Sequence, residues 1–130
     1  MISNTFLKGL YSETEKPGQI FPLETQSIIR DRYEFAASFC QGQRVLEIGS
    51  GSGFAIEFLS SQLSSLTCLE FSTDNYTALK AKERANVAVH QGDAHELPFA
   101  EQSFDSVIAL AMIYYLDLEK FLSEVHQVLV

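Results

Sequence analysis

The amino-acid sequence predicts an α/β fold in which a mainly parallel sheet is flanked by helices. Three observations predict it. Short β-rich runs alternate with segments of helical periodicity, an apolar run enters a glycine-rich turn directly, and the chain has no internal repeat. This alternation is typical of βαβ units, in which crossover helices join parallel strands.

The expected elements follow one another along most of the chain. Strands are expected at residues 44–48, 66–71, 87–91 and 104–110. Helices are expected at residues 24–39, 53–63, 73–85 and 118–129. The last helix has the clearest pattern, because its apolar residues form one stripe and Asp117 precedes it as an N-cap.

Residues 1–22 are the least patterned part of the chain. They are expected to form an N-terminal arm or lid, because Pro17, Gly18 and Pro22 interrupt any long helix. The domain proper is then residues 23–130, long enough for one hydrophobic core. No apolar run is long enough to cross a membrane, and the N-terminus lacks the pattern of a secretory signal. A cytoplasmic location without membrane contact is therefore expected.

Charge and cysteine content exclude several classes of function. The formal net charge is −8 and no run of Lys or Arg offsets it, which disfavours nucleic acid as a partner. Cys40 and Cys68 lie far apart without a CxxC pair or a histidine at ligand spacing. Neither a disulfide framework nor a metal site is predicted, and both thiols are expected to be buried and reduced.

A glycine-rich turn after the first strand is the sharpest motif. The apolar run that ends at Ile48 leads directly into Gly49, Gly51 and Gly53, and a helix is expected next. Glycines permit positive φ in such a turn and let the backbone approach a ligand closely, while the helix N-terminus offers free amides. The pattern predicts a nucleotide-type ligand at this turn.

An acidic residue at the end of the next strand supports adenosine binding. Glu70 stands where a carboxylate can accept hydrogen bonds from both hydroxyls of a ribose. The residue serves a nicotinamide dinucleotide equally well, so an NAD-dependent oxidoreductase is a less favoured alternative. The dinucleotide fingerprint requires a third glycine where this chain has Phe54.

Four motifs in order resemble those of class I S-adenosylmethionine-dependent methyltransferases, especially the metabolite-modifying type 11 group. The resemblance covers roughly residues 40–130 and implies a Rossmann-like domain with S-adenosylmethionine as cofactor. The motifs are Glu47-Ile48-Gly49-Ser50-Gly51-Ser52-Gly53, then Glu70, then Gln91-Gly92-Asp93-Ala94 with Leu97-Pro98-Phe99, and Phe104-Asp105-Ser106-Val107-Ile108.

The resemblance implies a role for each residue of the cofactor site. Glu47 and the turn formed by Gly49, Ser50, Gly51 and Gly53 would hold the methionine end, and Glu70 the ribose. Asp93 would bind the adenine amine and Ala94 would offer its amide to the ring. Phe71 and Leu97 would form apolar walls.

The catalytic residues are less well defined. Methyl transfer needs the acceptor in line with the methyl group and its sulfur, and needs a base only if the acceptor loses a proton. Tyr115 stands where many type 11 members have histidine, and because a phenol is a poor general base at neutral pH, a pocket wall or hydrogen-bond donor is the favoured role. His95 is a second, weaker candidate, with an exposed loop histidine as the alternative. The segment after the fourth strand lacks Asn-Pro-Pro-Tyr, which argues against enzymes that methylate nucleic-acid bases.

The chain departs from the family in length. The resemblance implies three further strands, so this chain would hold only the N-terminal half of the domain, truncated after the fourth strand and its helix. Strand 104–110 would then be a sheet edge presenting Val107, Ile108 and Leu110, and a homo-oligomer is expected through it. The expected acceptor is a small molecule or sugar-type metabolite. A non-catalytic cofactor-binding or oligomerisation module is the alternative.

Overall fold

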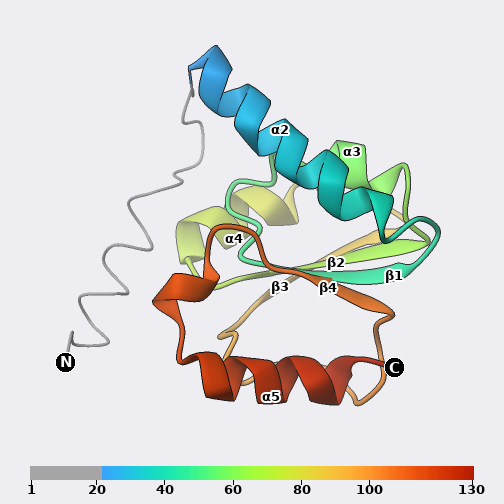
Figure 1. Cartoon of the computed structure of the whole chain (residues 1–130), viewed down its shortest axis with the longest axis vertical. Helices are drawn as coiled ribbons and strands as arrows, with labels where there is room; N and C mark the ends of the chain where they lie inside the picture. The colour runs from blue at the N-terminus through green and yellow to red at the C-terminus, as the bar shows by residue number, and fades with distance from the viewer. Residues whose placement is uncertain (1–21) are drawn as a thin grey trace.

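A four-stranded parallel sheet forms the centre of the computed structural model, which describes residues 22–130 (Figure 1). Its order is β3-β2-β1-β4, and it confirms the predicted α/β Rossmann-like fold. The strands are β1 Arg44–Ile48, β2 Ser65–Glu70, β3 Val87–Gln91 and β4 Ser106–Ile108. The helices are α2 Leu23–Ser38, α3 Ile56–Ser60, α4 Thr73–Lys80, η1 Ile113–Tyr115 and α5 Leu118–Val128. The predicted arm lies outside the described residues except for Pro22.

Two apolar cores lie on opposite faces of the sheet because side chains alternate along each strand. Val45 of β1 joins the core with α2, α3 and α4, while its neighbour Leu46 joins the core with α5. Figure 1 shows α2 and α3 on one side of the sheet and α5 on the other. Cys40 and Cys68 are both buried free thiols, as predicted. Among the described residues, no helix is long and apolar enough to span a membrane.

Several predicted bounds are wrong, each for a structural reason. The helix expected from Gly53 begins only at Ile56, because Gly53 has a φ of +79° and closes the turn instead. The helix expected to reach residue 85 ends at Lys80, where the chain turns back and Arg84 bridges the start of β3. Strand β2 begins at Ser65 and ends at Glu70, which leaves Phe71 outside the sheet.

The predicted strand 104–110 is much shorter in the structure. Phe104 forms a parallel bridge with Leu129 after α5 instead of pairing with β1. After Ile108 the chain leaves the sheet, and Ala111 takes a φ of +55° as it turns. The expectation that Ile108 presents its side chain at the edge is also wrong. Ile108 is buried in the core beneath α2.

Candidate cofactor site

The glycine turn lies at the carboxyl end of β1 and has the backbone geometry that the sequence predicts. Gly49, Gly51 and Gly53 have φ values of +77°, +57° and +79°, in the left-handed region that favours glycine. Space also demands glycine at two of these positions. A Cβ on Gly49 would lie 3.1 Å from Cγ of Met112, and one on Gly53 would lie 2.5 Å from Cδ2 of Leu79.

Glu70 connects the end of β2 to this turn. Its Oε2 accepts a hydrogen bond from the amide of Gly51 at 2.8 Å, and its Oε1 accepts one from the amide of Ser72 at 3.0 Å. Only 2% of Glu70 is exposed, so it is not a solvated strand-end residue. The amide of Gly92 in turn donates to the Glu70 carbonyl at 3.1 Å, which ties the segment after β3 to the same corner.

Glu47 is a second buried carboxylate, two residues before the turn. It is 2% exposed, and burial raises the pKa of its carboxyl group. The hydroxyl of Tyr33 on α2 donates to Oε1, and the thiol of Cys68 on β2 lies 3.8 Å from Oε2. Both contacts counter the rise of the Glu47 pKa because they stabilise the charged form.

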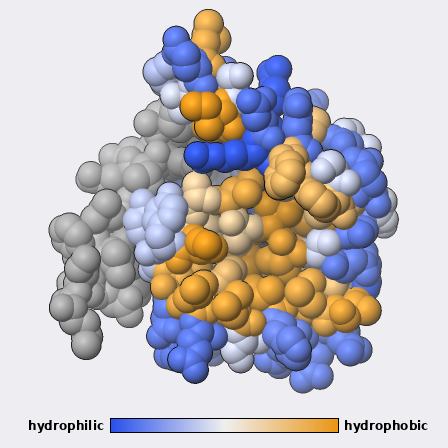
Figure 2. Space-filling view, viewed as in Figure 1, coloured by the Kyte–Doolittle hydropathy of each residue, from blue (hydrophilic) through white to orange (hydrophobic). Residues whose placement is uncertain are grey.

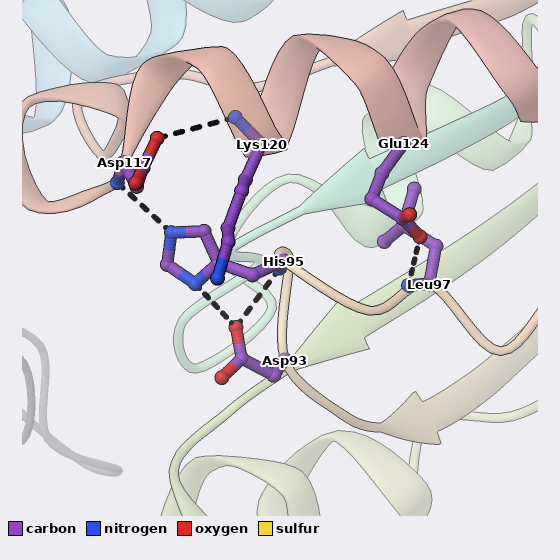
Figure 3. A network of polar contacts seen from close by, with 6 residues as sticks. All are labelled: Asp93, His95, Leu97, Asp117, Lys120 and Glu124. Carbon is purple, nitrogen blue, oxygen red and sulfur yellow. Dashed lines mark hydrogen bonds and ion pairs between the residues drawn. The ribbon is translucent and has the colours of Figure 1, made fainter.

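The segment after β3 brings Asp93 and His95 into one polar network (Figure 3). Oδ1 of Asp93 accepts from the backbone amide of His95 at 2.9 Å and lies 2.8 Å from its Nδ1. The other ring nitrogen, Nε2, accepts from the amide of Asp117 at 2.9 Å. Since Nε2 is an acceptor, the proton of the neutral ring is on Nδ1 and is donated to Asp93.

His95 therefore links the predicted adenine-binding loop to the N-terminus of α5. Asp117 is the N-cap of that helix, and its Oδ1 accepts from the amide of Lys120 at 3.2 Å, as the sequence predicts. A second contact ties the same two segments, because the amide of Leu97 donates to Oε2 of Glu124 at 2.7 Å (Figure 3). Both ring nitrogens of His95 are engaged, one by Asp93 and one by the amide of Asp117, so this geometry favours a positioning role over a catalytic one.

The segment after β4 also lies next to the glycine turn. Met112 is buried, and its side chain lies against the space that a Cβ on Gly49 would occupy. The short helix η1 follows it directly. Tyr115 lies in η1, half-buried, with its ring 4.6 Å from that of Tyr114. Ile113 and Tyr114 are exposed apolar residues of the same turn. The elements that carry Glu70, Gly49 and Tyr115 thus meet at the carboxyl ends of the central strands, where open α/β sheets bind ligands.

A family comparison identifies the family of the chain. Residues 46–130 match the model of a methyltransferase domain family. The chain belongs to this family. S-adenosylmethionine is the cofactor of this methyltransferase domain.

Two curated relatives are similar in sequence to this chain. It is 30% identical over 130 residues to the fatty-acid O-methyltransferase of Mycolicibacterium smegmatis, covering 92% of this chain and 47% of that protein. It is 27% identical over 128 residues to the chloroplastic 2-methyl-6-phytyl-1,4-hydroquinone methyltransferase 2 of Oryza sativa subsp. japonica, covering 95% of this chain and 36% of that protein. The chain thus spans less than half the length of these curated relatives.

Solved structures agree with the fold of the methyltransferase chain. The YcgJ protein of Bacillus subtilis aligns with a TM-score of 0.68 at 26% identity, covering 77% of this chain and 46% of that one. The PH0226 protein of Pyrococcus horikoshii aligns with a TM-score of 0.71 at 23% identity, covering 83% of this chain and 54% of that one, and shows the fold alone.

The residues of the methyltransferase site fit this cofactor. S-adenosylmethionine carries a cationic sulfonium and an ammonium group, and the two carboxylates beside the turn, Glu47 and Glu70, are both nearly inaccessible to water. A buried carboxylate is stabilised by an opposite charge, so a cationic ligand suits this corner. The tight positive-φ turn at Gly49 and Gly51 lets the backbone approach a ligand.

Other predicted site residues lie in less direct positions. Ser50 is buried, and its hydroxyl lies 3.5 Å from the carbonyl oxygen of Glu47. Ala94 and Leu97 are buried in the core beneath α5, whereas Phe71 is half-buried just beyond β2. Tyr33 is not among the predicted site residues, because its place among the apolar residues of α2 gives no sign of a partner on β1.

One hollow near the turn lies on the α2 side. It has a volume of about 600 Å³ and is lined by residues of α2 and of the segment that runs from the turn into α3. Its lining includes Tyr33 and Phe54 but neither Glu70 nor Asp93. The hollow is therefore distinct from the corner where the buried carboxylate of Glu70 meets the glycine turn.

Proposed function

We propose that this chain carries the cofactor-binding half of an enzyme that transfers a methyl group from S-adenosylmethionine to a small-molecule acceptor. The observation that carries the proposal is the corner formed by Glu70 and Gly51, where a buried carboxylate meets a positive-φ glycine turn. The cofactor supplies an electrophilic methyl group on a sulfonium. The residues of this chain bind and orient it: Glu47 at the methionine end, Glu70 at the ribose, and Asp93 at the adenine.

The turn after β4 supports an apolar acceptor. Met112 packs beside Gly49, and the residues that follow it, Ile113 and Tyr114, expose 44% and 67% of their surfaces. Exposed apolar side chains next to a ligand site favour an apolar partner. Two relatives point the same way, since their names state a fatty acid and a phytyl hydroquinone as acceptors. Tyr115 in the same turn is the residue we propose to line the acceptor pocket.

Binding and transfer are tested separately. Isothermal titration with S-adenosylhomocysteine and with NAD should show binding of the first ligand alone. Transfer of a labelled methyl group is then measured on a panel containing a fatty acid, a prenylated hydroquinone and a sugar. Cofactor binding without transfer to any acceptor would favour a non-catalytic cofactor-binding module, and binding of NAD would favour an oxidoreductase.

We further propose that a second copy of the chain pairs at the edge of β4. Within residues 22–130, β4 is bonded to β1 on one side and to no strand on the other. Figure 2 shows a broad apolar area on the face between α2 and α5. The exposed apolar residues near this face are Phe35 on α2, Phe39 directly after α2, and Leu118 and Leu122 on α5. An edge with apolar flanks is a site for strand pairing between chains.

A further inference from the structure

The carboxylate of Glu47 lies in an otherwise apolar row of the sheet. Strand register places it beside Cys68 on β2 and Ile108 on β4, and both neighbours belong to the core beneath α2. The next residue, Ile48, points to the opposite core. Glu47 is thus a charged group on an apolar face, where a carboxylate without partners is strongly disfavoured.

Tyr33 supplies the strongest of the described contacts to this carboxylate. A tyrosine hydroxyl is protonated at neutral pH, so it donates and Oε1 of Glu47 accepts. The thiol of Cys68 faces Oε2, and burial raises the pKa of that thiol, which keeps its proton in place. Among residues 22–130, no lysine, arginine or histidine forms an ion pair with Glu47. The carboxylate of Glu70 is also close enough to raise the pKa of the Cys68 thiol by charge repulsion.

These contacts define the orientation of the carboxyl group without saturating it. The hydroxyl of Tyr33 contacts Oε1, the thiol of Cys68 faces Oε2, and the hydroxyl of Ser50 also stabilises the charged form. A carboxylate offers about four lone-pair sites, so one further donor can still be accepted. A ligand ammonium group is such a donor. Removing the Tyr33 hydroxyl leaves the buried carboxylate without its strongest donor, with only the Ser50 hydroxyl and a weak thiol donor among the described side-chain contacts.

We propose that Tyr33 is a positioning residue for cofactor binding, whose hydroxyl holds Glu47 as an oriented carboxylate beneath α2. The inference rests on the proposed role of Glu47 at the methionine end of the cofactor. It assigns a function to α2, a helix that lies outside the matched family segment and precedes the glycine turn in the sequence. Helix α2 thereby contributes to the cofactor site through β1, without touching the ligand.

The test measures S-adenosylhomocysteine binding by titration calorimetry in a double-mutant cycle. Tyr33→Phe keeps the ring that packs on the core and removes only the hydroxyl. It should weaken binding about tenfold, the effect of losing a hydrogen bond to a charged group. In a Glu47→Gln background the same change should have almost no effect, because there is no charge to orient. Tyr76→Phe on α4, which packs against the same core, is the matched control and should bind like wild type.

A pH series separates this role from a purely structural one. Protonated Glu47 cannot balance an ammonium group, so binding weakens as pH falls through the pKa of Glu47. Without the Tyr33 hydroxyl that pKa rises, so the loss of binding should begin at a higher pH in Tyr33→Phe. A carbon-13 titration of Glu47 in the ligand-free chain should show the same upward shift, which keeps the inference testable if the variant binds too weakly to measure.

Each contrary result has its own meaning. If wild type fails to bind, the proposed cofactor site itself is wrong. Binding by wild type but equal affinity in Tyr33→Phe, an unmoved pH midpoint, or the same tenfold loss in the Glu47→Gln background would overturn the role of Tyr33 while leaving the cofactor site intact. Unchanged affinity in Glu47→Gln would remove the basis of the inference.

Discussion

Gly51, in the turn after β1, donates its amide hydrogen to Oε2 of Glu70 at the end of β2, over a distance of 2.8 Å. The second oxygen, Oε1, accepts from the amide of Ser72 just beyond β2. The carboxylate proposed to bind the ribose therefore also holds the glycine turn in shape. Glu70 thus combines a proposed role in ligand binding with a structural role in the glycine turn.

Glu70 substitutions should separate these two roles. Glu70→Gln keeps an acceptor oxygen and the packing, so we expect cofactor affinity to fall about ten- to hundredfold with a modest loss of stability. Glu70→Ala should in addition lower the free energy of unfolding by about 1–3 kcal/mol, because two backbone amides lose their acceptor. Calorimetric titration and urea denaturation measure the two effects. Full affinity in Glu70→Gln would show that the residue serves the turn alone.

Ligand binding should stabilise the fold selectively. A ligand that binds only the folded state adds about 2.7 kcal/mol at a hundredfold excess over its Kd. We expect S-adenosylhomocysteine to raise the melting temperature accordingly and NAD to leave it unchanged. Differential scanning fluorimetry with both ligands is the measurement. Equal shifts with the two ligands would contradict the proposed site.

Glu47 should make the ligand-free chain less stable as pH rises. Burial raises the pKa of its carboxyl group in the folded state, so its contribution to stability is complete at low pH and is lost as pH rises through that raised value. Glu47→Gln cannot ionise, so it should be more stable than wild type at about pH 8 and similar to it at about pH 4. Urea denaturation across this range checks the sign. A stability gap that widens toward low pH would contradict the expected protonation.

His95 should contribute to stability through α5 and not through chemistry. Its ring joins Asp93 to the amide of Asp117 with contacts of 2.8 and 2.9 Å. His95→Ala should lower the free energy of unfolding by about 1–3 kcal/mol, the loss of two hydrogen bonds. His126→Ala, an exposed histidine on the same helix, is the control and should have little effect. Equal stability of the two variants would mean that the hydrogen bonds of His95 do not contribute to the free energy of unfolding.

The edge of β4 should govern the association state. If a second copy pairs there, sedimentation should show a dimer or larger species. Leu122→Lys places a charge on the exposed apolar side of α5 and should shift the chain toward monomer, whereas Leu23→Lys at the start of α2 should not. A soluble wild-type monomer at high concentration would contradict strand pairing between copies. Ile108 is unsuitable for this test because it lies in the core.

The parts of the fold that the sequence predicts well are those with local causes. The bounds of β1 and β3 match, since each is a short β-rich run, and β3 ends at Gln91, directly before Gly92. The N-cap at Asp117 is equally local. By contrast, β4 is short because Phe104 pairs with a residue beyond α5, a contact between distant positions that no pattern in either segment reveals.

The candidate site divides in the same way. The glycine turn and Glu70 follow from spacing along one βα unit, so the sequence predicts them directly. The partners of Glu47 and His95 lie 14 and 22 residues away, at Tyr33 and Asp117. Their identity depends on how helices pack on the sheet, and only the three-dimensional arrangement supplies it.

The bridge between Phe104 and Leu129 has a consequence for how the molecule opens. The amide of Phe104 donates to the carbonyl of Val128 at 3.1 Å, and the carbonyl of Phe104 accepts from the amide of Val130 at 2.9 Å. The chain just before β4 is therefore hydrogen-bonded to the C-terminal end of α5. The helix is also tied at its N-terminus by His95. A segment held at both ends loses little by fraying and exchanges its amides with solvent mainly when it detaches as a whole. We therefore expect helix α5 and the loop that carries Asp93 and His95 to unfold locally as one cooperative unit.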